Sequence, residues 1–182
     1  MKNSNSILAA QSKEWLLQAL LILMDKKEFK NITVKEIAAK AGVDRKTFYR
    51  HFETKEDILR FYTDRVCQDY IAELESQYTL TTFTISKAYF SMCQKYISFF
   101  RKLEKNNLLI FLLQAFDEYL PIIHKFFDSD DTTNNIIYYS EYALSYYTGG
   151  FWNISTKWIR DGASKTPEEM ALLVEKIMST PL

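Results

Sequence analysis

The sequence predicts an all-α protein made of two helical parts. Only four glycines and three prolines occur in 182 residues, whereas all-β proteins use both residue types freely in their turns. Hydrophobic residues make up 47% of the chain, which is enough for a real core and argues against disorder. Apolar residues recur three and four positions apart behind capping residues, and this spacing indicates amphipathic helices.

The first expected helix follows Ser12, which can cap it, and runs to about Lys26. Residues 1–11 are mostly small and polar, and we expect them to form a loose arm. The apolar face of the helix consists of Leu16, Ala19, Leu20, Leu23 and Met24. This face predicts that the helix packs on one side against the elements that follow.

Capping residues also mark the next helices. Thr33 and Glu36 have the spacing of a capping box, which opens a second helix that Gly42 ends. Asp44 can cap a short third helix to about His51. Two helices joined by a tight turn at a glycine form a helix-turn-helix arrangement. We therefore expect a helix-turn-helix domain over residues 1–54.

A linking helix over residues 55–76 is expected next, opened by Thr54 and Asp57, and then a second helical domain over residues 77–182. Residues 78–86 are polar and β-branched, so we interpret them as the connection between domains. Helices are expected at about 85–101, at 108–127 with a bend or split near Phe116–Pro121, at 136–160, and at 167–178 after the Thr166–Pro167 start signal.

The third helix has two contrasting faces. Phe48 and Phe52 are four residues apart and are expected to be buried. The other face presents donors and a ring that suit a DNA major groove, with two residues at its flanks: Arg45, Lys46, Tyr49 and Arg50, flanked by Thr47 and His51. A merely solvated charged face is the alternative. Residues 1–66 hold 13 Lys+Arg against 9 Asp+Glu, and residues 67–182 hold 10 against 14, so the basic surplus lies beside this helix.

The stretch "ITVKEIAAKAGVDRKTFYRHFETKEDIL", residues 32–59, strongly resembles the DNA-binding domain of the TetR family of bacterial transcriptional regulators. The resemblance implies a fold of about nine helices and a ligand-responsive repressor that binds a palindromic operator as a homodimer. It implies that the third helix enters the groove and that Thr33, Val34 and Lys55 lie at helix N-termini beside phosphates. Asp44 stands where Ser or Thr is common in the family, and it caps a helix equally well.

The stretch "YYTGGFWNISTKWIRDGASKTPEEMALLVEKI", residues 146–177, resembles the last two helices of a TetR subgroup that includes regulators of dihydroxyacetone kinase operons. This implies a homodimer through helices at about 136–160 and 167–178. The first of these helices is apolar on nearly every side, which agrees with a partner surface. Gly149 and Gly150 suggest either a close helix approach or a simple kink.

The family resemblance also implies a ligand cavity in the second domain. The candidate wall residues are Tyr89, Cys93, Tyr96, Phe100, Phe116, Tyr119 and Tyr142. Packed core is the alternative for each of them. A second alternative is an activator or co-regulator controlled by a protein partner, because the subgroup includes such a protein.

Enzyme, metal and membrane roles are not expected. The two histidines, His51 and His124, and the two cysteines, Cys67 and Cys93, have no metal-ligand spacing. Nucleophile-elbow, dinucleotide and P-loop motifs are absent. We therefore expect no catalysis, no cofactor and no metal. We also expect a cytoplasmic protein, because no signal peptide or membrane span is evident.

Overall fold

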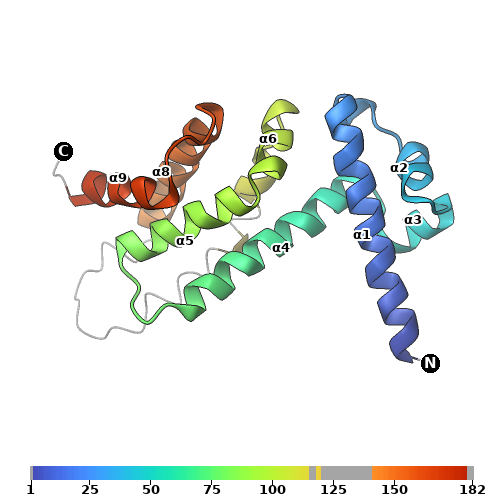
Figure 1. The fold of residues 1–182 in the computed structure, drawn as a ribbon, viewed down its shortest axis with the longest axis horizontal. Coiled ribbons are helices and arrows are strands. Elements are labelled where there is room, and N and C mark those ends of the chain that lie inside the picture. The colour runs from blue at the N-terminus through green and yellow to red at the C-terminus, as the bar shows by residue number, and fades with distance from the viewer. Residues whose placement is uncertain (1, 115–117, 120–140, 180–182) are drawn as a thin grey trace. The chain divides into compact units, whose positions relative to one another are not determined.

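A computed structural model describes residues 2–114, 118–119 and 141–179, and every regular element within these ranges is helical (Figure 1). The all-α prediction is confirmed for this part of the chain. The helices in order are α1 (Lys2–Lys26), the 3-10 turn η1 (Phe29–Asn31), α2 (Val34–Ala41), α3 (Arg45–His51), α4 (Lys55–Ser76), α5 (Thr82–Lys95), α6 (Ile97–Lys105), α8 (Glu141–Arg160) and α9 (Pro167–Ser179). Residues 110–114 are also helical.

Helix α1 begins eleven residues earlier than expected, at Lys2 rather than directly after Ser12, so the prediction of a loose arm over residues 1–11 is wrong for residues 2–11. The Ser12 hydroxyl donates to the Leu8 carbonyl at 2.8 Å, which places Ser12 inside a helix rather than at its cap. The segment Ile7–Lys26 has the length and mean hydropathy, 1.3, of a membrane-crossing helix. A core helix of a soluble protein meets the same criteria, and Leu16 and Leu20 are fully buried here.

The cap predictions for α2 and α3 are confirmed. Thr33 and Glu36 form the reciprocal hydrogen bonds of a capping box, and Gly42 ends α2 at φ 70°. Glycine reaches this left-handed conformation without the steric cost of a Cβ. The Asp44 carboxylate accepts the Thr47 N–H at 2.7 Å and so caps α3. Figure 1 shows α2 and α3 packed beside α1.

Two expectations for the middle of the chain are wrong. The connection expected over residues 78–86 ends early, because Thr81 and Thr84 form a capping box and α5 begins at Thr82. The helix expected over 85–101 is broken at Tyr96, where φ is −104° and ψ is 18°. The Tyr96 hydroxyl donates to the Asp69 carboxylate of α4, and this contact accompanies the break.

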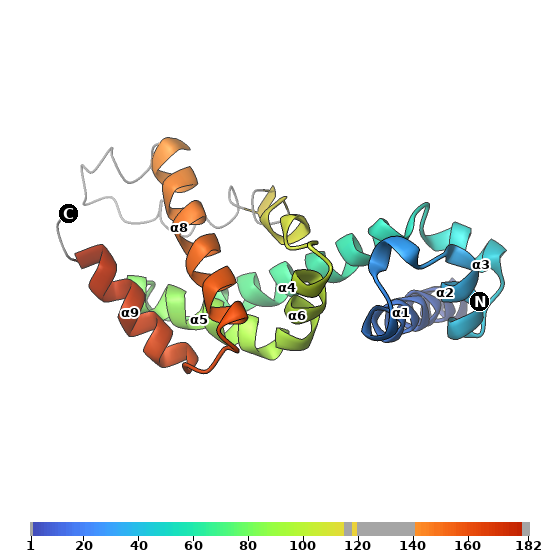
Figure 2. The same cartoon turned by 90° about the horizontal axis from the view of Figure 1, so that it is seen from above.

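The chain forms two compact units. The first comprises Met1–Arg65 with Lys102–Phe111, and the second comprises Val66–Arg101 with Leu112–Leu182. The division falls within α4, after Arg65, whereas the boundaries 54 and 77 expected from the sequence remain predictions. In the second unit α9 lies along α5, as Figures 1 and 2 both show.

Both cysteines lie in the second unit and are buried. Cys67 of α4 is 1% exposed and Cys93 of α5 is 2% exposed. Burial raises the pKa of the Cys93 thiol well above its usual range. A thiol that is protonated and shielded in this way is chemically inert while the fold is closed.

The apolar residues of α9 recur three and four positions apart, as in an amphipathic helix, and this stripe divides between two environments. Met170 and Val174 are buried, whereas Leu173, Ile177 and Met178 are exposed. In α8, a Cβ added to Gly149 or Gly150 would meet no described atom within 4 Å. A close helix approach, one of the two alternatives for these glycines, is therefore absent from the described part of this chain. Residues 136–140 of the expected helix lie outside the described residues.

Candidate nucleic-acid interface

Helix α3 presents a polar face over a buried anchor. Phe48 is 0% exposed and Phe52 is 6% exposed, so the two rings hold the helix in the core of the first unit. The opposite face is exposed and carries Arg45, Lys46, Tyr49 and Arg50, with Thr47 and His51 half-buried at its flanks. The Tyr49 side chain is 52% exposed despite its ring. Large exposed aromatic rings among cations are unusual on a merely solvated helix face.

The polar side chains of α3 are already ordered by local contacts. The Arg45 guanidinium lies over the Tyr49 ring, 5.9 Å from its centroid. Arg50 donates to the Thr47 hydroxyl at 2.9 Å, next to the Asp44 cap. Such contacts reduce the rotamer freedom that binding would otherwise remove. The two guanidinium groups suit guanine edges, and the ring suits a thymine methyl group or a sugar.

His51 closes the end of α3 as a neutral side chain near pH 7. Its pKa lies below the ordinary value because of partial desolvation first, and then because of the nearby cations Arg50 and Lys13. A neutral imidazole has one donor nitrogen and one acceptor nitrogen. His51 therefore offers hydrogen bonding rather than charge at the edge of the face.

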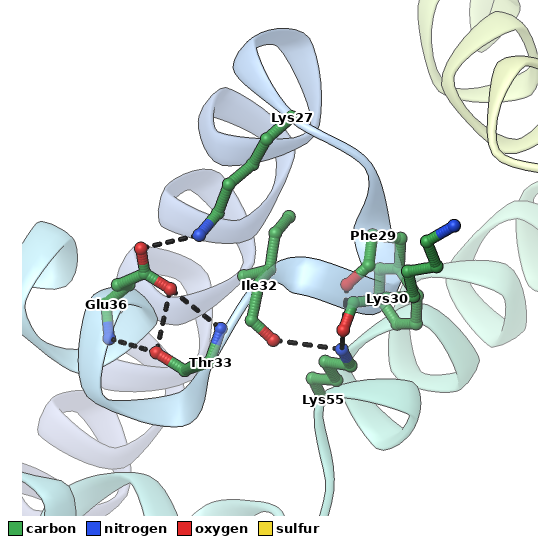
Figure 3. A network of polar contacts seen from close by, with 7 residues as sticks. All are labelled: Lys27, Phe29, Lys30, Ile32, Thr33, Glu36 and Lys55. Atoms are coloured by element: carbon green, nitrogen blue, oxygen red, sulfur yellow. Dashed lines mark hydrogen bonds and ion pairs between the residues drawn. The ribbon is translucent and has the colours of Figure 1, made fainter.

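The start of α2 is tied to the end of α1, as Figure 3 shows. The Thr33 hydroxyl donates to Glu36 Oε2 at 2.7 Å, and Lys27 Nζ contacts Glu36 Oε1 at 2.5 Å. The hydrogen bonds from Lys27 and then from Thr33 lower the pKa of the Glu36 carboxyl to about 2. Val34, at the first position of α2, is half-buried. The hydroxyl proton of Thr33 is thus directed to a carboxylate of the protein.

Lys55, at the first position of α4, points its ammonium group at main-chain carbonyls of the loop between α1 and α2 (Figure 3). It donates to the carbonyls of Phe29 at 2.7 Å, Lys30 at 3.1 Å and Ile32 at 2.9 Å. The spacing of charged residues in the sequence carries no signal for these contacts, because their acceptors are backbone atoms.

The candidate ligand wall lies in the second unit, where its described residues contact other side chains. Tyr89, Cys93 and Phe100 are buried, and the Tyr89 hydroxyl accepts from Ser155 at 2.9 Å. Tyr96 is half-buried against Asp69, and Tyr119 is half-buried in a short helical piece. Phe116 and the side chain of Tyr142 lie outside the described residues.

Two family matches cover most of the chain. Residues 12–60 match the family described as bacterial regulatory proteins, tetR family. Residues 76–180 match the family described as transcriptional regulator C-terminal region. The first match contains α2, the turn and α3, and the second contains α5 to α9.

Similar proteins agree with these matches. An uncharacterized HTH-type transcriptional regulator of Bacillus subtilis, YxbF, is 30% identical over 79 residues, which are 43% of this chain and 21% of that protein. The aligned part of the chain thus spans about a fifth of that relative's length. The structure of a fatty acid degradation regulator, FadR, from Bacillus halodurans matches with a TM-score of 0.65 and 16% identity, over 92% of this chain and 94% of that one. At this identity the likeness shows the fold.

Proposed function

We propose a function for this chain from the premise that it belongs to the TetR family of bacterial regulatory proteins. It is accordingly a DNA-binding transcriptional regulator. We propose that it is a repressor that acts as a homodimer on a palindromic operator in the cytoplasm. The observation that carries the proposal is the α3 face, where exposed cations and Tyr49 lie directly above the buried Phe48.

The reading face consists, in this proposal, of Arg45, Lys46, Thr47, Tyr49, Arg50 and His51 of α3. A seven-residue helix with its basic side exposed can enter a major groove while its apolar side stays in the protein. The start of α2, at Thr33 and Val34, is proposed to lie beside the DNA backbone. Contacts of this second kind orient the protein on the duplex without reading its sequence.

The homodimer is proposed to form through α8 and α9. Four large side chains of α9 are exposed although they are apolar: Leu172 at 53%, Leu173 at 40%, Ile177 at 52% and Met178 at 37%. Tyr146 of α8 is 68% exposed. A second copy that covers both helices would bury this surface in a four-helix arrangement. A two-fold dimer in turn favours a palindromic operator, with one half-site for each α3.

The second unit is proposed to respond to a small-molecule effector. Its aromatic residues and hydroxyl groups, among them Tyr89 and Tyr96, suit an apolar ligand with few polar atoms. Effector binding would change the affinity for the operator through a coupling between two sites. A panel of metabolites scored by thermal stabilisation of the protein tests this part.

The DNA-binding proposal is tested by selecting duplexes from a random-sequence library with the full chain. We expect a palindromic site whose affinity falls steeply with added salt, because several cations meet phosphates. An Arg45→Ala, Tyr49→Ala double variant is the matched control, since both side chains are exposed. Failure to enrich any sequence, or equal enrichment by the double variant, would refute the assignment of the face.

A further inference from the structure

The loop between α1 and α2 has carbonyl groups that its own backbone pairs only in part. Within Glu28–Thr33, the turn η1 contributes two backbone hydrogen bonds. The Asn31 N–H donates to the Glu28 carbonyl, and the Ile32 N–H donates to the Phe29 carbonyl. Lys55 reaches across from the start of α4 and satisfies three carbonyls of this loop. An ammonium group has three donors, and all three are taken by these acceptors.

The loop that accepts these hydrogen bonds is itself held in place by other contacts. The Phe29 side chain is 5% exposed, and its ring lies 4.6 Å from Lys55 Nζ. The Phe29 N–H donates to Asn106 Oδ1 at 2.7 Å, so the residues after α6 anchor the same turn. A cation over a ring face gains a further attraction. The ammonium therefore occupies a fixed position lined by three carbonyls and one ring.

We propose that Lys55 is a positioning residue that closes the helix-turn-helix, and not a phosphate ligand. The Lys55 clasp, meaning Lys55 Nζ with the carbonyls of Phe29, Lys30 and Ile32, joins the two ends of residues 29–55. Helix α2, the turn and α3 all lie between these ends. To bind a phosphate, the ammonium would exchange three acceptors for one group and leave the Lys30 and Ile32 carbonyls without this donor, whereas the Phe29 carbonyl would still accept the Ile32 N–H.

The clasp orients the elements on both sides of the reading helix. The Ile32 carbonyl directly precedes Thr33, the cap of α2, while Lys55 begins α4 four residues after the end of α3. Closing a segment at its ends removes conformational freedom that it would otherwise have. This inference rests on the proposed function only where it concerns DNA, because the clasp also predicts the stability of the free protein.

The first experiment measures thermal melting of the DNA-free full chain. Lys55→Met keeps the length and apolar stem but removes the donors, and Lys55→Arg keeps the charge but replaces a compact ammonium with a planar fork. We expect both variants to melt about 5 °C or more below the wild type. Lys46→Met is the control and should melt with the wild type, because Lys46 is exposed on α3. Wild-type melting of both Lys55 variants would overturn the clasp.

The second experiment measures how affinity for a library-selected duplex depends on salt. Loss of a phosphate contact lowers the slope of log affinity against log salt by about 0.9. For Lys55→Met we expect weaker binding with the wild-type slope, whereas a slope reduced by about 0.9 would show a phosphate ligand and overturn the proposal. If no duplex is selected, the proposed function fails while the melting experiment still decides the clasp.

Discussion

Because α3 has a buried and an exposed face, substitutions of the adjacent residues Phe48 and Tyr49 should have opposite effects: the first should mainly lower stability, and the second should mainly lower DNA affinity. Phe48 is 0% exposed and contacts the rings of Tyr49 and Phe52 at centroid distances of 5.3 and 6.2 Å. Truncating a buried phenylalanine to alanine costs about 3–5 kcal/mol of unfolding free energy. Phe48→Ala is therefore expected to melt roughly 10 °C below the wild type, at about 2–4 °C per kcal/mol for a chain of this size.

Tyr49→Ala should cost much less stability. Its side chain is 52% exposed, so about half of a full aromatic burial is lost, roughly 1 kcal/mol. The edge-to-face contact with Phe48, at an interplanar angle of 81°, contributes about 0.5–1.5 kcal/mol more. The expected loss is thus about 1.5–2.5 kcal/mol. Binding to the selected duplex should nevertheless fall at least about fivefold, because one good contact at a base edge is worth about 1–3 kcal/mol.

Two measurements on the same preparations separate the effect on stability from the effect on DNA binding. Denaturant unfolding, monitored by circular dichroism, gives the stability, and a gel shift gives the affinity for the duplex. Tyr49→Phe is the matched control, since it keeps the ring over which Arg45 lies and should keep wild-type stability. A Tyr49→Ala protein as unstable as Phe48→Ala would show that the buried and exposed faces are assigned wrongly. Wild-type affinity of the Tyr49→Ala variant for the duplex would show that the Tyr49 ring does not belong to the reading face.

Four other variants address the rest of the chain. A Leu173→Glu, Ile177→Glu double variant should sediment as a monomer with wild-type helicity, because both side chains are exposed in the protomer; an intact dimer would contradict the proposed interface. Ala163→Gly should raise the unfolding free energy by about 0.5–1 kcal/mol, because glycine relieves the backbone strain at φ 54°. Asn107→Gly, at φ 58°, should raise the unfolding free energy by less. Equal melting temperatures of the Ala163→Gly variant and the wild type would contradict this expectation. The Glu36 carboxyl has a folded pKa of about 2 against an ordinary 4.5, so its stabilisation is complete above pH 4.5 and is lost as pH falls toward 2. Glu36→Gln should therefore flatten the acid limb of a stability–pH curve, and an unchanged limb would contradict that pKa.

Sequence reasoning succeeded where a structure is decided by neighbouring residues. The caps at Thr33, Asp44 and Thr166 depend on side chains that reach backbone groups three residues away, so the chain itself displays them. The faces of α3 followed from helical spacing in the same way. These local signals predicted the limits of α2 and α3.

Sequence reasoning failed where tertiary contacts decide. Ser12 has the chemistry of a cap but bonds back to the Leu8 carbonyl inside a longer helix. The stripe on α9 is periodic throughout, yet its periodicity cannot say which part packs on α5 and which part remains exposed. The carbonyl partners of Lys55 were missed as well, because they lie more than twenty residues earlier in the chain.

The two buried thiols make the second unit measurable without any mutation. Cys67 and Cys93 are the two cysteines of the chain, and both belong to that unit. A thiol reagent reaches them only when the surrounding packing opens, so the labelling rate reports the opening equilibrium of this unit alone. An effector that binds the closed unit should slow labelling in proportion to its occupancy. The wild-type chain thus serves as its own kinetic reporter for identifying that effector.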